Sequence, residues 1–115
     1  MYKLIIVLEK RHLRGKFDAL WPRFLHHAER MPGLRREATS HIEEVLIGDV
    51  SLGLVHELFF ETLADLRQAM ASPDGQAAGR LLQEIAAGDL SLMIADHKED
   101  DIANLLKYRK TEDAA

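Results

Sequence analysis

The chain has 115 residues, of which 47% are hydrophobic and 30% charged, with a formal net charge of −4. This length predicts one domain whose core buries roughly two-thirds of the unfolded surface. The acidic balance and the dispersed Lys and Arg residues argue against nucleic acid as a partner, because phosphate binding needs clustered cations. The chain has no cysteine, which excludes disulfide bonds, a thiolate nucleophile and cysteine-bound metal.

The first half of the chain predicts a strand, a helix and a second strand. Tyr2 to Lys10 contains a short β-branched and apolar run, typical of a strand buried on both faces. Apolar side chains recur at helical spacing from Phe17 to Met31, and Pro32-Gly33 ends that helix. Leu34 to Leu46 is expected to be a strand, and Gly48-Asp49 supplies a turn.

The second half predicts a strand, two helices and a last strand. Leu52 to Glu61 is nearly continuous apolar sequence, which indicates a central strand. Thr62 to Asp65 resembles a capping box at the start of one helix, and Ser72-Pro73 is a typical start for the next. Gly75 and Gly79 are interpreted as close-packing positions in the second of these helices. Leu90 to His97 completes the pattern as a strand.

The order β-α-β-β-α-β predicts an α+β fold of the ferredoxin-like type, with helices on one face of a four-stranded antiparallel sheet. The domain is expected over residues 1–99, followed by a C-terminal extension at 100–115 with a short helix and a tail. The other sheet face would be left uncovered and apolar. A homodimer that joins two such faces into a dimeric α+β barrel is therefore predicted.

The apolar run Leu4 to Leu8 is too short for the core of a signal peptide and far too short to span a membrane. We therefore expect a cytoplasmic protein with no membrane partner.

Several sequence motifs of this chain resemble those of the EthD-like family of dimeric α+β-barrel proteins. The resemblance covers about residues 2–98 and is carried by five segments: Tyr2-Lys3-Leu4, Phe17 with Trp21, Pro32-Gly33-Leu34-Arg35, Glu57 to Thr62, and Ser72 to Gly75. One departure concerns the histidine that the family usually has four residues after the tryptophan. Leu25 stands there, and His26 and His27 follow, so the corresponding histidine is ambiguous.

This resemblance implies a pocket for a small apolar organic ligand, aromatic or carbonyl-bearing. The wider group includes monooxygenases, lactone isomerases, polyketide cyclases and haem-degrading enzymes, so the fold alone does not name a reaction. A cofactor-independent oxygenase, isomerase or cyclase is the leading hypothesis. The alternatives are a non-enzymatic ligand-binding or accessory protein, and a haem-binding relative with His26 or His27 as axial ligand.

The candidate catalytic residues are His26, His27 and Glu57. Adjacent histidines on a helix point about 100° apart, so one of them should lie at the edge of the buried side, where it could act as acid or base or only make a hydrogen bond. Glu57 interrupts an apolar strand, and a carboxylate there is costly unless it is paired, hydrogen-bonded or neutral. We expect it to face the dimer-enclosed barrel, as a catalytic or a structural group, with His56 on the other face.

The candidate ligand contacts are Trp21, His41, Phe59 and Arg35. Each has a plainer interpretation: Trp21 as a core residue, His41 as a surface or interface histidine, Arg35 as a solvated cation. There is no His-Glu-x-x-His helix and no histidine pair four residues apart, so a zinc hydrolase is not expected, and no metal is predicted. The Gly-x-Ser-x-Gly motif of a serine hydrolase is also absent.

Overall fold

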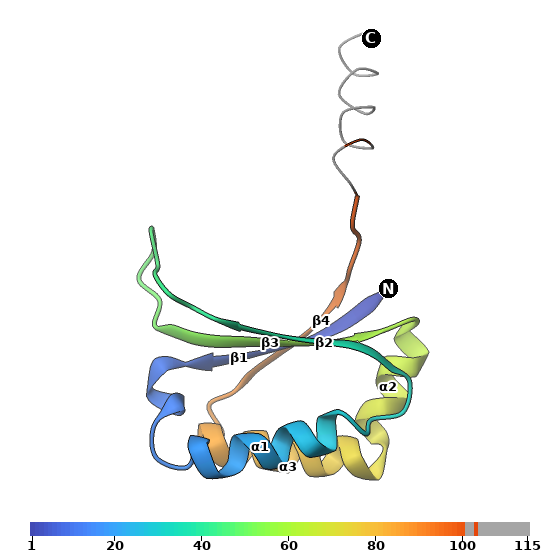
Figure 1. Cartoon of the computed structure of the whole chain (residues 1–115), viewed down its shortest axis with the longest axis horizontal. Coiled ribbons are helices and arrows are strands. Elements are labelled where there is room, and N and C mark those ends of the chain that lie inside the picture. The colour runs from blue at the N-terminus through green and yellow to red at the C-terminus, as the bar shows by residue number, and fades with distance from the viewer. Residues whose placement is uncertain (101–102, 104–115) are drawn as a thin grey trace, which may run out of the picture.

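The computed structural model describes residues 1–100 and 103 and consists of one four-stranded sheet with three α-helices on one side (Figure 1). The strands are β1 (Tyr2–Glu9), β2 (Leu34–His41), β3 (Leu52–Phe60) and β4 (Ser91–Asp96). The helices are α1 (Phe17–Ala28), α2 (Leu63–Ala71) and α3 (Pro73–Ala86), with a short 3-10 helix η1 (Lys10–Leu13) after β1.

All neighbouring strands are antiparallel, in the order β2-β3-β1-β4. The predicted ferredoxin-like α+β fold is confirmed. Apart from residues 100 and 103, the expected C-terminal helix and tail lie outside the described residues. Among the helices of the described chain, none combines the length and the apolar character that crossing a bilayer requires.

Two predicted boundaries were wrong. The first helix ends at Ala28 instead of Met31, because the amides of Arg30 and Met31 bond to carbonyls only three residues back, which tightens the chain before Pro32. The second strand ends at His41 instead of Leu46. Beyond one further hydrogen bond, from Ile42 N to Gly53 O, the chain leaves the sheet as a projecting hairpin.

The two predicted helix starts are confirmed. The Thr62 hydroxyl accepts a hydrogen bond from the amide of Asp65 at 3.0 Å, at the start of α2. The Ser72 hydroxyl accepts one from the amide of Gly75 at 3.0 Å, and Pro73 begins α3. Thr62 thus caps the start of α2 and Ser72 caps the start of α3, so the chain breaks between the two helices at Ser72.

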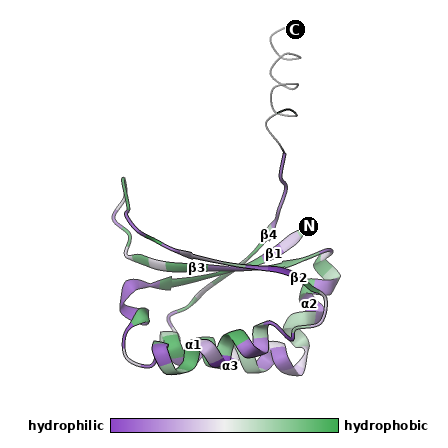
Figure 2. Ribbon diagram, in the orientation of Figure 1, coloured by the Kyte–Doolittle hydropathy of each residue, from purple (hydrophilic) through white to green (hydrophobic). Residues whose placement is uncertain are grey.

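The sheet has one face against the helices and one open face. Alternate residues of β1 and β3 point to the helices and form the core with side chains of α1, α2 and α3, whereas the intervening residues point away from them. In Figure 2 both central strands are mostly hydrophobic in colour, as expected for strands that carry apolar residues on both faces. The open face holds the half-buried Ile5, Val7 and Val55.

The two glycines of α3 have different environments. A Cβ atom at Gly75 would lie 2.0 Å from the carbonyl oxygen of Ala69, so the turn from α2 to α3 passes too close for any side chain. A Cβ atom at Gly79 would meet nothing within 4 Å. The close-packing interpretation is confirmed for Gly75 and wrong for Gly79, which lines an open space.

Candidate functional site

A histidine is buried completely between the sheet and α1. His56 on β3 has no exposed surface, and its ring makes edge contacts with Trp21 and Phe24 of α1, at centroid distances of 5.1 and 5.5 Å. On the neighbouring strand β2, the Thr39 hydroxyl lies 2.8 Å from its Nδ1, and the Glu37 carboxylate lies 3.2 Å from its Nε2. A histidine, a carboxylate and a hydroxyl are therefore held together beneath two aromatic rings.

The surroundings of His56 favour the neutral imidazole. Burial lowers the pKa of His56 below its ordinary value, and the nearby Glu37 carboxylate opposes this effect without cancelling it. Neither Nε2 of His56 nor the facing oxygen of Glu37 has a well-aligned hydrogen bond, although both atoms are buried. Buried polar atoms without a good partner are costly, so this pair is unusual for a residue that only fills the core.

An apolar cavity of about 200 Å³ lies on the same side of the sheet. It is bounded by residues from β1, β3 and β4 and by all three α-helices. The lining residues are Leu4, Ile6, Phe24, Met31, Leu58, Met70, Gly75, Gln76, Ala78, Gly79, Leu82 and Leu92. Gln76 is the one member of this set with a polar side chain. The missing side chain of Gly79 leaves room in the wall.

Phe24 connects the cavity with the buried histidine. Its ring lines the cavity and also contacts the ring of His56. Leu58, another cavity residue, is two positions from His56 on the same face of β3, a spacing of about 7 Å along the strand. His56 and Glu37 thus lie immediately behind one wall of the cavity, and the Phe24 ring separates His56 from the cavity space.

Glu57 lies on the open face, as expected, opposite the face that holds His56 and the cavity. Its carboxylate pairs with the Lys3 ammonium at 2.5 Å, and its side chain is 20% exposed. Phe59, on the same face, lies beneath Arg36, whose guanidinium carbon is 4.1 Å from the ring centroid. The pairing with Lys3 satisfies the charge of Glu57.

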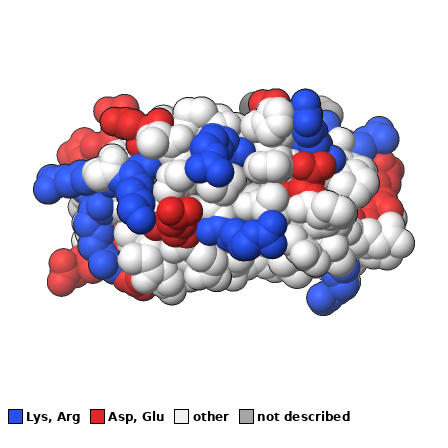
Figure 3. Space-filling view, turned by 90° about the horizontal axis from the view of Figure 1, so that it is seen from below, with Lys and Arg blue, Asp and Glu red and all other residues white. Residues whose placement is uncertain are grey.

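His26 and His27 lie on the outer side of α1, away from both Glu57 and the cavity. His26 is exposed, and His27 bonds to the Asp74 carboxylate at 2.9 Å across to α3. His27 also borders a polar groove with Arg23 and Arg80. Figure 3 shows this helical face of the molecule, where Lys and Arg alternate with Asp and Glu and no large area carries one sign of charge.

The predicted ligand contacts also lie apart from one another. Trp21 is half-buried and stacks on Phe24 at a centroid distance of 4.8 Å, one ring away from the cavity. His41 is exposed on β2, and the exposed Arg35 faces Glu61 at 3.7 Å. The structure therefore brings only Trp21 near the cavity.

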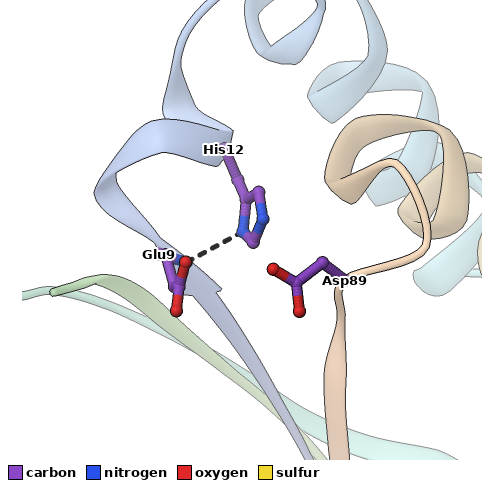
Figure 4. Close-up of side chains that lie close together, drawn as sticks. All are labelled: Glu9, His12 and Asp89. Carbon is purple, nitrogen blue, oxygen red and sulfur yellow. Dashed lines mark hydrogen bonds between the residues drawn. The ribbon is translucent and has the colours of Figure 1, made fainter. Parts of the chain in front are cut away.

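Glu9, His12 and Asp89 form a second cluster, with three potential metal-binding atoms within 4.8 Å of one another (Figure 4). Nδ1 of His12 accepts a hydrogen bond from the Glu9 amide at 3.0 Å. The guanidinium of Arg11 contacts both carboxylates, and its hydrogen bond to Glu9 holds the pKa of that carboxyl below its ordinary value. This cluster already contains a cation, and we interpret it as an ion-pair group.

His56 and Glu37 were not among the functional residues predicted from the sequence. The apolar neighbours of His56 placed it on the helix side of the sheet, which is correct, but a lone histidine among them gave no sign of a partner. The partner, Glu37, lies on β2. The strand register places Thr39 opposite His56 and Glu37 opposite Leu58, so that the Glu37 side chain lies beside the imidazole. The alternation of Glu37, Thr39 and His41 on one face of β2 was the available signal.

Comparisons with known proteins support the fold. No family model matches this chain. An uncharacterised 11.0 kDa protein of Rhodococcus erythropolis, from the thcB-thcC intergenic region, is 25% identical over 99 residues, which cover 85% of this chain and 96% of that protein.

Solved structures are similar over most of the chain. An EthD family protein of Bacillus halodurans superposes with a TM-score of 0.70 at 24% identity and covers 85% of this chain and 99% of its own. SnoaB, a cofactor-independent oxygenase of Streptomyces nogalater, superposes with a TM-score of 0.60 at 14% identity, and the match covers 86% of this chain and 93% of the SnoaB chain. A dimeric ferredoxin-like protein of unknown function from Jannaschia superposes with a TM-score of 0.64 at 14% identity, and the match covers 84% of this chain and 97% of that chain. The predicted resemblance is confirmed at the level of the fold, which this chain shares with an EthD family protein.

Proposed function

We propose that this protein binds a small, mainly apolar organic molecule in the cavity between the sheet and the helices. The observation that carries this proposal is the cavity itself, which has about 200 Å³ of space and an almost wholly apolar wall. An enclosed engineered cavity of about 150 Å³ with an apolar lining binds benzene, so a space of this size can hold one aromatic ring. A single aromatic ring with a small substituent is therefore the class of ligand that fits.

The polar group of the wall narrows this class further. Gln76 is exposed and borders the cavity from α3, where its amide nitrogen bonds to the carbonyl of Ala71 at 3.2 Å. A carboxamide can donate to a ligand carbonyl, and a few placed polar groups usually orient a ligand in an apolar pocket. An aromatic ketone such as acetophenone combines the ring with one carbonyl and is therefore a suitable probe ligand.

Gly79→Leu is expected to abolish binding of acetophenone. The new side chain would occupy the space beside Gly79 without meeting other atoms at its Cβ, so the fold should tolerate it. Gly79→Ala is the matched control, because it adds one methyl group and should retain measurable affinity. Isothermal titration calorimetry gives both values. Equal affinity in the wild type and Gly79→Leu would place the ligand elsewhere and contradict the proposal.

The chemistry that the geometry supports best is proton transfer without a cofactor. A C–H group next to a ligand carbonyl would give its proton to the His56 imidazole, leaving an enolate, and the Glu37 carboxylate would stabilise the resulting imidazolium. Proton transfer to His56 requires the Phe24 ring to turn aside and the imidazole to rotate, because both of its nitrogens face Thr39 and Glu37 of β2. The same enolate is the kind of stabilised carbanion that oxygenation without metal or flavin needs, and SnoaB, which shares the fold, is a cofactor-independent oxygenase.

Exchange of the acetophenone methyl protons in D₂O tests this step directly. The wild type is expected to accelerate the exchange seen by proton NMR, and His56→Gln should reduce the rate by at least about 100-fold while acetophenone still binds. Glu37→Gln should give a smaller loss. Binding without exchange in the wild type would rule out the proton-transfer proposal and favour a non-enzymatic ligand-binding protein.

The haem-binding alternative finds no support in this geometry. Neither His26 nor His27 lines the cavity, and a haem macrocycle is far larger than the space between the sheet and the helices.

We also propose that the protein forms a homodimer through the open face of the sheet. The support is the row of half-buried apolar side chains there, together with the exposed Met93 of β4, which lies opposite Ile5 on the same face. A similar fold occurs in the dimeric ferredoxin-like protein from Jannaschia. Sheet faces of this kind are usually covered by another sheet or by helices.

A further inference from the structure

The hairpin between β2 and β3, residues 42–51, carries the most exposed large apolar side chains of the described chain. Leu46 is 84% exposed, Ile47 is 95% exposed and Val50 is 54% exposed. We refer to this segment as the arm. A soluble protein rarely presents neighbouring aliphatic side chains at a loop tip unless they are buried against another surface.

The arm projects away from the body of the molecule on the side opposite the helices. Figure 1 shows it rising from the end of β2 and β3 on the open-face side, and Figure 2 shows its tip in the colour of hydrophobic residues. Any body seated on the open face would lie within reach of the arm. Since the arm leaves β2, it extends one of the two edges of the sheet.

The other edge of the sheet is formed by β4, which carries one exposed apolar side chain on the open face. This residue is Met93, which is 47% exposed and lies opposite Ile5. Leu92 and Ile94 lie opposite the buried Ile6 and Leu4, on the helix side of the sheet. When two such sheets are stacked by a two-fold axis parallel to their strands, the β2 edge of one copy comes over the β4 edge of the other. The arm of each copy would then lie at the same edge of the dimer as the other copy's β4, whose Met93 points to the shared face.

We propose that the arm clasps a second copy of the chain, its tip packing against the edge strand β4 of that copy on the face that carries Met93. This inference rests on the proposed homodimer and adds the surfaces that hold it. The occupant is a second copy because the same chain supplies both the apolar tip of the arm and Met93, and each lies on an edge that lacks a neighbouring strand among the described residues.

The test compares two double variants by sedimentation equilibrium. Leu46→Ser with Ile47→Ser removes the apolar tip, and we expect the dimer dissociation constant to rise at least about 100-fold, because two large aliphatic side chains lose their burial. Glu43→Ser with Glu44→Ser changes the same arm at polar positions and should leave the constant within about threefold of the wild type. Circular dichroism checks that each variant is folded.

Engineered cross-linking tests the contact itself, and the lack of native cysteine makes the result specific. Leu46→Cys and Met93→Cys single variants are mixed, oxidised and separated without reductant. A disulfide-linked heterodimer supports the proposal.

In the sedimentation experiment, a wild-type monomer at micromolar concentration would remove the dimer and the clasp together. A dimer whose dissociation constant is unchanged in the Leu46→Ser, Ile47→Ser variant would overturn the clasp alone. Neither result depends on acetophenone binding.

Discussion

Replacement of Gly75 by alanine is expected to lower the free energy of unfolding by about 3 kcal/mol, the upper end of the usual cost of overpacking. The added Cβ would lie 2.0 Å from the Ala69 carbonyl oxygen and 2.8 Å from that of Met70. Both obstacles are backbone atoms, so no side-chain rotation can relieve the contact. The α2–α3 turn would have to open, which weakens the Ser72 cap and the wall of the cavity next to it.

Gly79→Ala is the control for this prediction, since both changes replace glycine by alanine in the same helix. Nothing lies within 4 Å of the new atom at position 79, and alanine is favoured over glycine in a helix by about 1 kcal/mol. Urea unfolding of the two variants should therefore shift the midpoint in opposite directions. Equal destabilisation by both would show that the close approach at Gly75 does not constrain the turn.

The sequence predicted the fold well because its signals are local. Continuous apolar runs identified the two central strands, and Thr62 and Ser72 identified the starts of α2 and α3, since a capping hydroxyl needs only the next few amides. The arm was missed for a related reason. The second strand was predicted to extend to Leu46, and only the loss of strand pairing after Ile42 shows that the sheet has already ended there.

The candidate site was harder to predict because it depends on strand register. Glu57 was placed on the correct face by alternation, but its pairing with Lys3 depends on the alignment of β1 with β3. His56 was assigned to the helix side, yet Glu37 and Thr39 reach it only through the register of β2 against β3. Periodicity assigns a residue to a face, whereas its neighbours across the sheet are set by contacts distant in sequence.

The orientation of α1 explains why its two histidines did not join a site. A helix has one face toward the sheet, and Trp21, Phe24 and Ala28 occupy it. His26 and His27 are left at the surface, where His27 pairs with Asp74. The buried histidine comes from the sheet instead, and the aromatic residues of α1 cover it.

The stability of the wild type is expected to fall as the pH is lowered below about 6.5, the ordinary pKa of histidine. Burial depresses the pKa of His56 in the folded state, so between these two values the unfolded chain binds a proton that folded His56 does not. The contribution of neutral His56 is therefore complete above the unfolded pKa and is lost as the pH falls. Each unit of depression is worth about 1.4 kcal/mol.

His56→Gln is expected to remove this part of the pH dependence, because glutamine fills a similar space and does not titrate. The other five of the six histidines are present in both proteins, so the difference between the two unfolding curves at pH 8, 7, 6 and 5 isolates position 56. Glu37 faces the imidazole and would stabilise its charged form, which works against the expected slope. A difference that stays constant with pH would mean that Glu37 offsets burial completely. A stability gap that widens in favour of the wild type at pH 5 would mean that the pair is charged in the fold, and that His56 could not begin proton transfer as a base.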